Sequence, residues 1–178
     1  EDGLAFHLYG GISTEAEIAG TKVAIREVSN YPWSGDIKIS IAPDNPAEFD
    51  VKLRIPGWSE GATIAVNGQR IEAKAENGYV TIRRTWSKGD DIALDLPMPA
   101  QRLYSHPGVI MNAGRVALKR GPLVYCVEEA DNPGGRVQRL KIRRNGKLEI
   151  KSDPALFDGV VTLTAAATTR LRRGSWSG

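Results

Sequence analysis

Apolar residues recur at every second position in several short segments of this chain. The segment 37–41 reads Ile-Lys-Ile-Ser-Ile, and the segments 51–55 and 92–96 alternate in the same way. An alternation of period two places one set of side chains against a core and the other in water, which is typical of a half-buried β-strand. Further candidate strands cover residues 4–9, 22–28, 115–119, 122–128, 137–143, 147–151 and 159–165.

Two Asn-Gly pairs predict tight hairpins between these strands. Asn67-Gly68 follows the apolar segment Ile64-Ala-Val66, and Asn77-Gly78 directly precedes Tyr79-Val-Thr-Ile82. Both residue types tolerate the positive φ angles of a type I′ turn. No window of helical length carries an apolar stripe of helical period. The segment that comes nearest to such a stripe, Thr14 to Ile18, is only one helical turn long. We therefore predict an all-β chain, an antiparallel sandwich or barrel.

A proline pair predicts a boundary inside the chain. The segment Leu96-Pro-Met-Pro99 holds two prolines two residues apart, which cannot both lie inside a central strand. We predict an antiparallel β-sandwich over residues 1–97, a linker over 98–108, and a second, smaller or truncated β-sandwich over 109–178. Because the chain starts with Glu1 rather than Met, we expect either a processed product or a fragment of a longer protein.

Composition narrows the class of protein without identifying it. Of the 178 residues, 41% are hydrophobic and 25% are charged, which is close to a globular average and argues against disorder. No apolar run approaches the ~20 residues that span a bilayer, so no membrane partner is expected. The first residues carry no secretory signal. A single cysteine fits either cytoplasm or periplasm, so the compartment stays open.

The chain offers few metal ligands or nucleophiles. Cys126 is its one cysteine, and His7 and His106 are its two histidines. A zinc site needs several thiolates or imidazoles, so we expect no metal and no cofactor in this chain. Cys126 follows Leu123-Val-Tyr, and a cysteine inside an apolar strand behaves as a small hydrophobe. His7 is expected on an outward-facing position, and His106, before Pro107, in a loop.

Three pairs of acidic residues could in principle supply a glycosidase with two facing carboxyl groups. They are Glu15 and Glu17, Asp90 and Asp91, and Glu128 and Glu129. Asp90 and Asp91 follow Lys88-Gly89 in a predicted turn, where aspartate caps backbone amides. We favour solvated or turn-capping roles for all three pairs. A phosphate-binding glycine loop is also absent from the sequence. We therefore predict no catalytic and no cofactor-binding residue.

The segment 136–147 is strongly basic and contains no acid. A nucleic-acid groove combines such cations with aromatic rings. No aromatic residue lies between Tyr125 and Phe157, so we favour a solvated edge strand, on which cations block edge pairing. No nucleic-acid partner is expected. The cations concerned are Arg136, Arg139, Lys141, Arg143, Arg144 and Lys147, with Arg170, Arg172 and Arg173 further on.

Three tryptophans stand at predicted strand ends beside proline or glycine, at Trp33, Trp58 and Trp86. Aromatic rings on rigid loops can stack on sugars, and they can equally close the end of a sandwich. Composition alone leaves both alternatives open. For Trp58, the preceding Pro56-Gly57 allows a sharp turn back over the sandwich, so we predict a mostly buried ring whose N–H is hydrogen-bonded.

Several short motifs occur together in an order that resembles a known family. The sequence resembles the C-terminal, non-catalytic half of the β-L-arabinofuranosidase family, glycoside hydrolase family 127, over residues 1 to about 135. The motifs are Tyr31-Pro-Trp33, Arg54-Ile-Pro-Gly-Trp58, Val66-Asn-Gly68, Gly78-Tyr-Val, Trp86-Ser-Lys-Gly-Asp90, Leu94-Asp-Leu-Pro-Met98 and Val116-Ala-Leu-Lys-Arg-Gly-Pro-Leu-Val-Tyr-Cys126.

The resemblance implies a helical (α/α)6 barrel followed by two β-sandwich domains. Catalysis in that family belongs to the barrel, where a zinc-bound cysteine is the nucleophile and a glutamate the acid/base, with the zinc held by three cysteines and a glutamate. Cys126 matches the Gly-Pro-Leu-Val-Tyr-Cys strand of a sandwich and not that nucleophile. No catalytic residue can therefore be carried over to this chain.

Our main hypothesis is an accessory β-sandwich region of a glycoside hydrolase, which packs on the catalytic barrel and supports self-association. The expected partners are the missing barrel and a second copy of the chain, with at most weak binding of carbohydrate. The parent protein is expected to be a glycoside hydrolase, whereas this chain alone is not expected to be an enzyme. The alternative is an independent carbohydrate-binding module that uses Trp33, Trp58 or Trp86.

Overall fold

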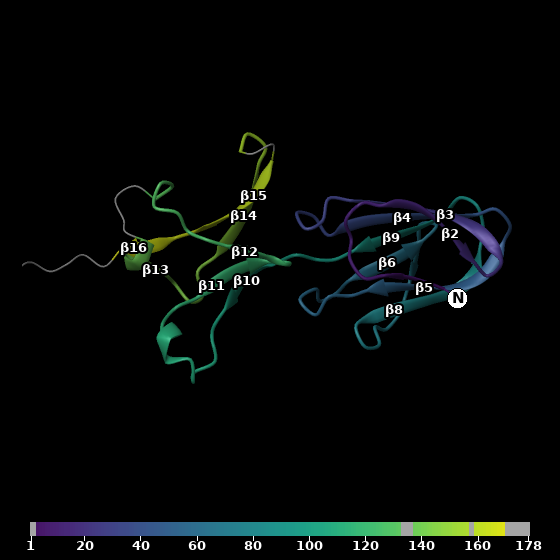
Figure 1. Cartoon of the computed structure of the whole chain (residues 1–178). Coiled ribbons are helices and arrows are strands. Elements are labelled where there is room, and N and C mark those ends of the chain that lie inside the picture. The colour runs from purple at the N-terminus through teal and green to yellow at the C-terminus, as the bar shows by residue number, and fades with distance from the viewer. Residues whose placement is uncertain (1–2, 133–136, 157–158, 170–178) are drawn as a thin grey trace, which may run out of the picture. The chain divides into compact units, whose positions relative to one another are not determined.

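The computed structural model describes residues 3–132, 137–156 and 159–169, and its chain divides into two units, Glu1–Pro99 and Ala100–Gly178 (Figure 1). Strands dominate both units, and the helical elements of the described residues are two three-residue 3-10 turns. The prediction of an all-β chain is confirmed. Each unit is described separately below.

One sheet of the first unit has three strands in the order β1-β5-β8. Strands β5 (Ala47–Arg54) and β8 (Tyr79–Trp86) pair antiparallel. Strand β1 (Gly3–Phe6) instead runs parallel to β5, which departs from the expectation of a purely antiparallel sandwich. Parallel neighbours require a long connection, and the chain supplies one by passing through three strands of the other sheet before it returns.

The second sheet of this unit has six strands, and every pairing in it is antiparallel. Its spatial order is β2 (Ser13–Ile18), β3 (Thr21–Ser29), β4 (Asp36–Pro43), β9 (Asp90–Asp95), β6 (Thr63–Val66) and β7 (Gln69–Ile71). Residues 14–18, the segment of the sequence nearest to a helical pattern, lie in β2, in agreement with the all-β prediction. Pairing with β3 and the burial of Ile18 decide this segment, which tertiary contacts hold extended.

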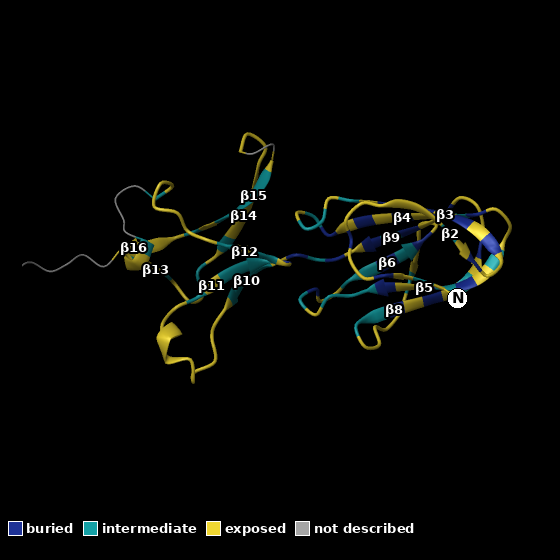
Figure 2. Ribbon diagram, in the orientation of Figure 1, coloured by how far each residue is buried: buried dark blue, intermediate teal, exposed yellow. Residues whose placement is uncertain are grey.

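The inner faces of the two sheets form one hydrophobic core, which appears as the dark blue stretches of the first unit in Figure 2. The alternation in the sequence predicted its members correctly. In β4 the isoleucines are at most 1% exposed while the lysine and serine between them face out, and β5 and β9 follow the same rule. The central residues are Ile37, Ile39, Ile41, Val51, Leu53, Ile92 and Leu94.

Both predicted Asn-Gly turns are present. Asn67 and Gly68 have φ angles of 51° and 75°, and Asn77 and Gly78 have φ angles of 50° and 80°. Two consecutive positive φ angles are the mark of a type I′ turn. The first turn joins β6 to β7 in the two-residue register Val66↔Gln69, and the second is closed by the bridge Glu76↔Tyr79.

Trp86, not Trp58, fills the core. Trp86 is fully buried at the end of β8, where its indole N–H donates to the carbonyl of Phe49 at 3.0 Å. The prediction for Trp58 holds in part for its burial and is wrong for its hydrogen bond: the side chain is partly buried against the core and its ring stacks on Tyr31 at 6.4 Å, but its N–H donates to no other described residue. Position 86 lies within a strand whose alternation turns it inward, whereas position 58 lies in a turn that leaves the sheet.

We expect Trp86→Ala to lower the free energy of unfolding by about 3–5 kcal/mol, because it empties a large core volume and leaves the Phe49 carbonyl unpaired. Trp58→Ala is the matched control and should cost clearly less, since that ring is only partly buried and its N–H donates to no other described residue. Urea unfolding of both variants measures the difference. Equal losses of stability would contradict the assignment of Trp86 as the core residue.

The second unit consists of three small, separate sheets. One contains β10 (Ala100–Leu103), β11 (Ala117–Arg120) and β12 (Leu123–Tyr125), and the two others are strand pairs. Those pairs are β13 (Leu140–Ile142) with β16 (Ala167–Thr169), and β14 (Leu148–Asp153) with β15 (Val160–Ala165). The 3-10 turns are η1 (Ile110–Asn112) and η2 (Val137–Arg139).

The linker predicted over residues 98–108 is wrong in its extent. Residues 100–103 form β10, which pairs antiparallel with β11, so the second unit begins directly after Pro99. The two prolines do end the first unit, but they do not prevent the next residues from forming an edge strand. Sequence reasoning missed β10 because its residues, Ala-Gln-Arg-Leu, show no clear alternation.

Among its described residues the second unit has no fully buried hydrophobic side chain, although several are half-buried. Every hydrophobic side chain classed as buried belongs to positions 6–98, and Figure 2 shows the second unit in teal and yellow. Several of its large apolar side chains are strongly exposed, with Ile110 at 80%, Met111 at 85% and Val124 at 71%. Because burial of apolar surface is the main favourable contribution to folding, the two units should differ in local stability.

Native-state hydrogen exchange should therefore separate the two units. We expect the slowest amides in the buried strands β3, β4, β5 and β9, and roughly hundredfold faster exchange in the amides of β10–β15, since local opening there exposes little new apolar surface. Mass spectrometry of peptic peptides from the intact chain measures both units in one sample. Equal protection of β11 and β4 would contradict this expectation.

Candidate functional site

Asp90 and Asp91 belong to a turn network and not to a catalytic pair. Asp90 accepts hydrogen bonds from the Ser87 amide at 2.9 Å and from the Asn67 side-chain amide at 2.7 Å. The Asp91 amide donates in turn to Asn67 Oδ1 at 2.9 Å. The predicted turn-capping role is confirmed, and the contacts tie the β8–β9 turn to the β6–β7 hairpin.

Several contacts compete to set the pKa of Asp90. Burial alone raises it, but the hydrogen bonds from Asn67 and Ser87 and the charge of Arg84, 3.7 Å away, outweigh burial. The net effect holds the pKa of the Asp90 carboxyl below its ordinary value of 3.8. A carboxyl with a lowered pKa in the folded state stabilises the fold above its ordinary pKa, and this stabilisation is lost as the pH falls through the folded-state pKa.

Asp90→Asn should therefore be less stable than the parent chain at neutral pH, and the difference should shrink as the pH is lowered below about 4, where the unfolded chain's carboxyl is protonated. Thermal unfolding between pH 3 and pH 7 measures the trend. Asp95→Asn, on the exposed face of β9, is the control and should show a smaller pH-dependent difference. A difference that stayed constant with pH would contradict the assigned role of the charge.

The two other acidic pairs also have local, structural contacts. Glu15 forms an ion pair with Lys22 at 2.6 Å, and Glu17 lies exposed on the same face of β2. Glu128 Oε1 accepts from the Cys126 thiol at 3.7 Å, and Glu129 Oε1 accepts from the Val137 amide at 3.2 Å. These contacts agree with solvated or turn-capping roles.

Cys126 is exposed and lies outside the strands, so the expectation of a cysteine inside an apolar strand is wrong. The strand β12 ends at Tyr125, one residue before it. His106 lies in a loop, as expected, and its Nδ1 accepts from the Gly108 amide at 3.1 Å. In the part of the chain that the structure describes, no three His, Cys, Asp or Glu side chains gather where they could hold a metal ion. These residues do not fit a zinc centre.

Only the described part of the basic segment can be placed, because Arg136, Arg170, Arg172 and Arg173 lie outside the described residues. Residues 137–139 form η2 and residues 140–142 form β13, a strand with a single neighbour. The Arg144 guanidinium lies over the Tyr104 ring at 5.2 Å. Sequence reasoning missed this pair because 40 positions separate the two residues.

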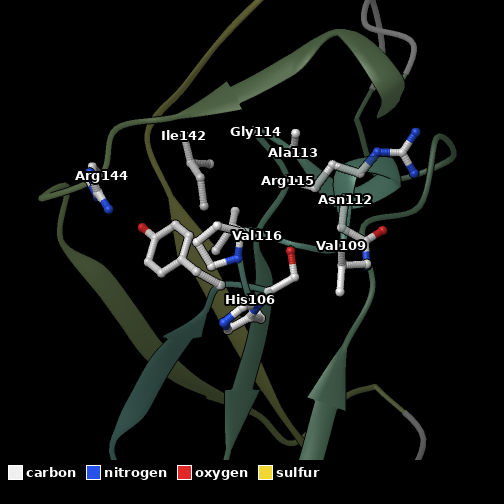
Figure 3. A pocket seen from close by; sticks show the side chains of 12 residues that line it. His106, Val109, Asn112, Ala113, Gly114, Arg115, Val116, Ile142 and Arg144 are labelled. Carbon is white, nitrogen blue, oxygen red and sulfur yellow. The ribbon is translucent and has the colours of Figure 1, made fainter.

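Arg144 and Tyr104 line the loop hollow, a cavity of about 500 Å³ in the second unit. Figure 3 shows Ile142 and Val116 directed into it, with His106 below and Val109 and Asn112 on one side. Arg115 directs its guanidinium away from the centre. The hollow lies beside Ile110 and Met111, the strongly exposed apolar residues of η1. The loop hollow and η1 together present an apolar surface with a cationic edge.

A second cavity, the tyrosine hollow, lies in the first unit and has a volume of about 410 Å³. Its walls come from the segments that follow β1, β3 and β5, from the last residue of β5 and from the first residue of β8. It is lined by His7, Leu8, Tyr9, Tyr31, Arg54, Pro56 and Tyr79. His7 is exposed, as predicted, but no sequence signal showed that it meets Tyr79, 72 positions away. That meeting follows from the parallel pairing of β1 with β5, which no local pattern predicts.

Hydrogen bonds fix the rings of this hollow. The Tyr9 hydroxyl donates to the Arg54 carbonyl at 2.7 Å, and His7 Nδ1 lies 2.7 Å from the Tyr79 hydroxyl oxygen. Burial, and then the charge of Glu27, raise the pKa of the Tyr9 hydroxyl far above its ordinary value, so it stays a neutral donor. The Arg54 guanidinium lies over the Tyr79 ring at 5.3 Å.

Trp33, Trp58 and Trp86, the tryptophans of the described residues, do not lie together on one exposed surface. Trp86 is sealed in the core, and Trp58 stacks on Tyr31. Trp33 is 44% exposed. Trp86 can therefore be removed from the list of candidate sugar-binding residues.

The sequence matches two family models in succession. Residues 3–98 match the middle domain of β-L-arabinofuranosidases of glycoside hydrolase family 127, and residues 100–165 match the C-terminal domain of that family. The chain belongs to glycoside hydrolase family 127. The two matches meet at the boundary that the structure places between Pro99 and Ala100.

Named relatives agree with this assignment. The chain is 38% identical over 127 residues to a non-reducing end β-L-arabinofuranosidase of Bifidobacterium longum, a match that covers 69% of this chain and 19% of that protein. A GH127 β-L-arabinofuranosidase from Geobacillus stearothermophilus T6 superposes with a TM-score of 0.88 at 42% identity, over 94% of this chain and 27% of that one. A second GH127 β-arabinofuranosidase superposes with a TM-score of 0.86 at 28% identity, and the match covers 94% of this chain and 29% of that one.

This GH127 chain thus spans about a fifth of the curated relative and under a third of the solved ones. The matched parts are the family's middle and C-terminal domains. Among the described residues, no helix has the length and apolar character that crossing a membrane requires.

Proposed function

We propose that this chain is a non-catalytic accessory region of a glycoside hydrolase, which packs against the remainder of a GH127 protein and supports self-association. The observation that carries this proposal is the match to the middle and C-terminal domains in succession, over residues 3–98 and 100–165. The relatives extend well beyond the part that this chain covers.

The second unit supports a docking role on physical grounds. Its large apolar side chains lie exposed, and contiguous apolar surface on a soluble protein marks an interaction site. Val109, Ile110 and Met111 are 47%, 80% and 85% exposed in one short loop beside the loop hollow. A protein surface that covered this loop would remove apolar area from water, which favours association. The same loop offers a contact for a second copy of the chain.

The same proposal includes an activity for the whole parent protein. The relatives named above are arabinofuranosidases, so the parent protein is proposed to release arabinose from arabinofuranosides. Among the described residues of this chain no group of metal ligands gathers, and Asp90 and Glu15 make local structural contacts. The chemistry is therefore proposed to reside in the remainder of the parent.

A complementation experiment tests this role. The part of the Geobacillus relative that this chain does not cover is produced separately and mixed with this chain. We expect a complex in size-exclusion chromatography with light scattering, and no arabinose release by this chain alone. The double variant Ile110→Ser, Met111→Ser should weaken the complex roughly tenfold or more, because it removes two large apolar contacts.

Lys52→Ser, on the exposed face of β5, is the matched control and should bind like the parent chain. Release of arabinose by the isolated chain would overturn the proposal, as would a failure of the two parts to associate. Light scattering of this chain by itself tests self-association, which the loop variant should also weaken.

A further inference from the structure

The tyrosine hollow brings aromatic rings and hydrogen-bond donors to one cavity. Its volume, about 410 Å³, falls in the range of small-molecule sites, roughly 300–1,000 Å³, and leaves room for a sugar ring. Three of its seven lining residues are tyrosines, and Pro56 and Leu8 add apolar surface, with Leu8 82% exposed at the rim. Such walls suit a ligand with apolar C–H faces.

Arg54 supplies the main hydrogen-bond donors of the tyrosine hollow. Its guanidinium forms no ion pair and no hydrogen bond with another described residue, although the residue is half-buried. The Tyr79 ring supports one side of the guanidinium at 5.3 Å, and Gly78 lies against it, since a Cβ there would come within 3.6 Å of its atoms. The five N–H donors of arginine form a planar fork that matches two adjacent oxygen acceptors.

Two further polar groups line the same space. His7 uses one ring nitrogen on the Tyr79 hydroxyl at 2.7 Å, which leaves the other nitrogen available. Tyr31 carries a hydroxyl that no described residue binds. None of the seven lining residues is acidic, so the hollow favours ligands that bring oxygen acceptors.

The hollow is also rigid before any ligand arrives. Tyr9 is 3% exposed and is held by its bond to the Arg54 carbonyl, and it packs edge-on against Tyr31 at 6.2 Å. Tyr31 is held in turn by Trp58. Preformed rings and donors reduce the ordering cost of binding.

We infer that the tyrosine hollow binds a single sugar ring, with the Arg54 fork on two adjacent oxygens of the sugar and the rings of Tyr31 and Tyr79 against its C–H faces. A sugar ring combines apolar faces with paired oxygens, which matches this lining, whereas a phosphate group has no apolar face to place against the aromatic rings. The paired oxygens are either neighbouring hydroxyls of a neutral sugar or the carboxylate of an acidic one. This inference does not depend on the docking role proposed above.

Nuclear magnetic resonance titration of the intact chain tests the inference, with L-arabinose as the neutral sugar and D-galacturonate as the acidic one, each up to tens of millimolar. We expect shift changes confined to the amides of residues 7–9, 54 and 79 and to the Arg54 side-chain N–H. Tighter binding of galacturonate identifies the carboxylate as the partner of Arg54, and tighter binding of arabinose identifies the hydroxyls. The absence of shifts at these positions with both sugars overturns the inference.

Variants then test the role of Arg54. Arg54→Met should weaken binding roughly tenfold or more, since hydrogen bonds to a charged group are lost. Arg70→Met, on an exposed position of β7 outside the hollow, should leave binding unchanged. If circular dichroism shows that Arg54→Met does not fold, Tyr79→Phe is used in its place. This variant keeps the aromatic ring but removes the hydroxyl that His7 binds, and it should weaken binding several-fold. If the folded variant binds the sugar with unchanged affinity, the inference is overturned. It is also overturned if the intact chain binds acetate, which has a carboxylate but no sugar ring, as tightly as it binds galacturonate.

Discussion

The burial of alternate side chains between two sheets is the constraint on which the first unit depends. Ile37, Ile39 and Ile41 extend from the six-stranded sheet toward Phe49 and Trp86 of the three-stranded sheet in one core cluster. Full burial of such a side chain is worth about 1.5–3 kcal/mol, which outweighs local preferences in the strands that carry them. It also holds residues 14–18 extended and seals Trp86 inside, where its N–H finds a backbone carbonyl.

The second unit lacks this constraint within the described residues, and its properties follow from that. Its strands form three small sheets, none of its described hydrophobic side chains is fully buried, and Ile110, Met111 and Val124 are strongly exposed. A small β-structure with little buried apolar area is marginal by itself, because the entropy of ordering the chain is not offset. An added protein surface would supply the missing burial. The family match, which places this unit as the C-terminal domain of much longer relatives, fits that physical need.

The first unit can carry a binding hollow because its core fixes the strand ends. Tyr79 starts β8, Arg54 ends β5, and His7 follows β1, so the register of one sheet brings the three side chains together. The donors are then oriented by neighbours that do not themselves need to contact a ligand, such as Tyr9 and Gly78. The two units thus suggest a division of roles, with a rigid site in one and a docking surface in the other.

The sequence by itself determined the all-β class, the inward positions of the main strands, both Asn-Gly turns, the turn-capping role of Asp90 and the family. Each of these depends on period-two alternation, on one- or two-residue backbone preferences or on short motifs, so neighbouring residues suffice to predict it. Only the tertiary structure decided the parallel pairing of β1, the extent of β10, the exposure of Cys126 and which tryptophan fills the core. It also decided the tyrosine hollow, because His7, Arg54 and Tyr79 meet through pairings between strands that lie far apart in the chain, and no local pattern encodes such pairings.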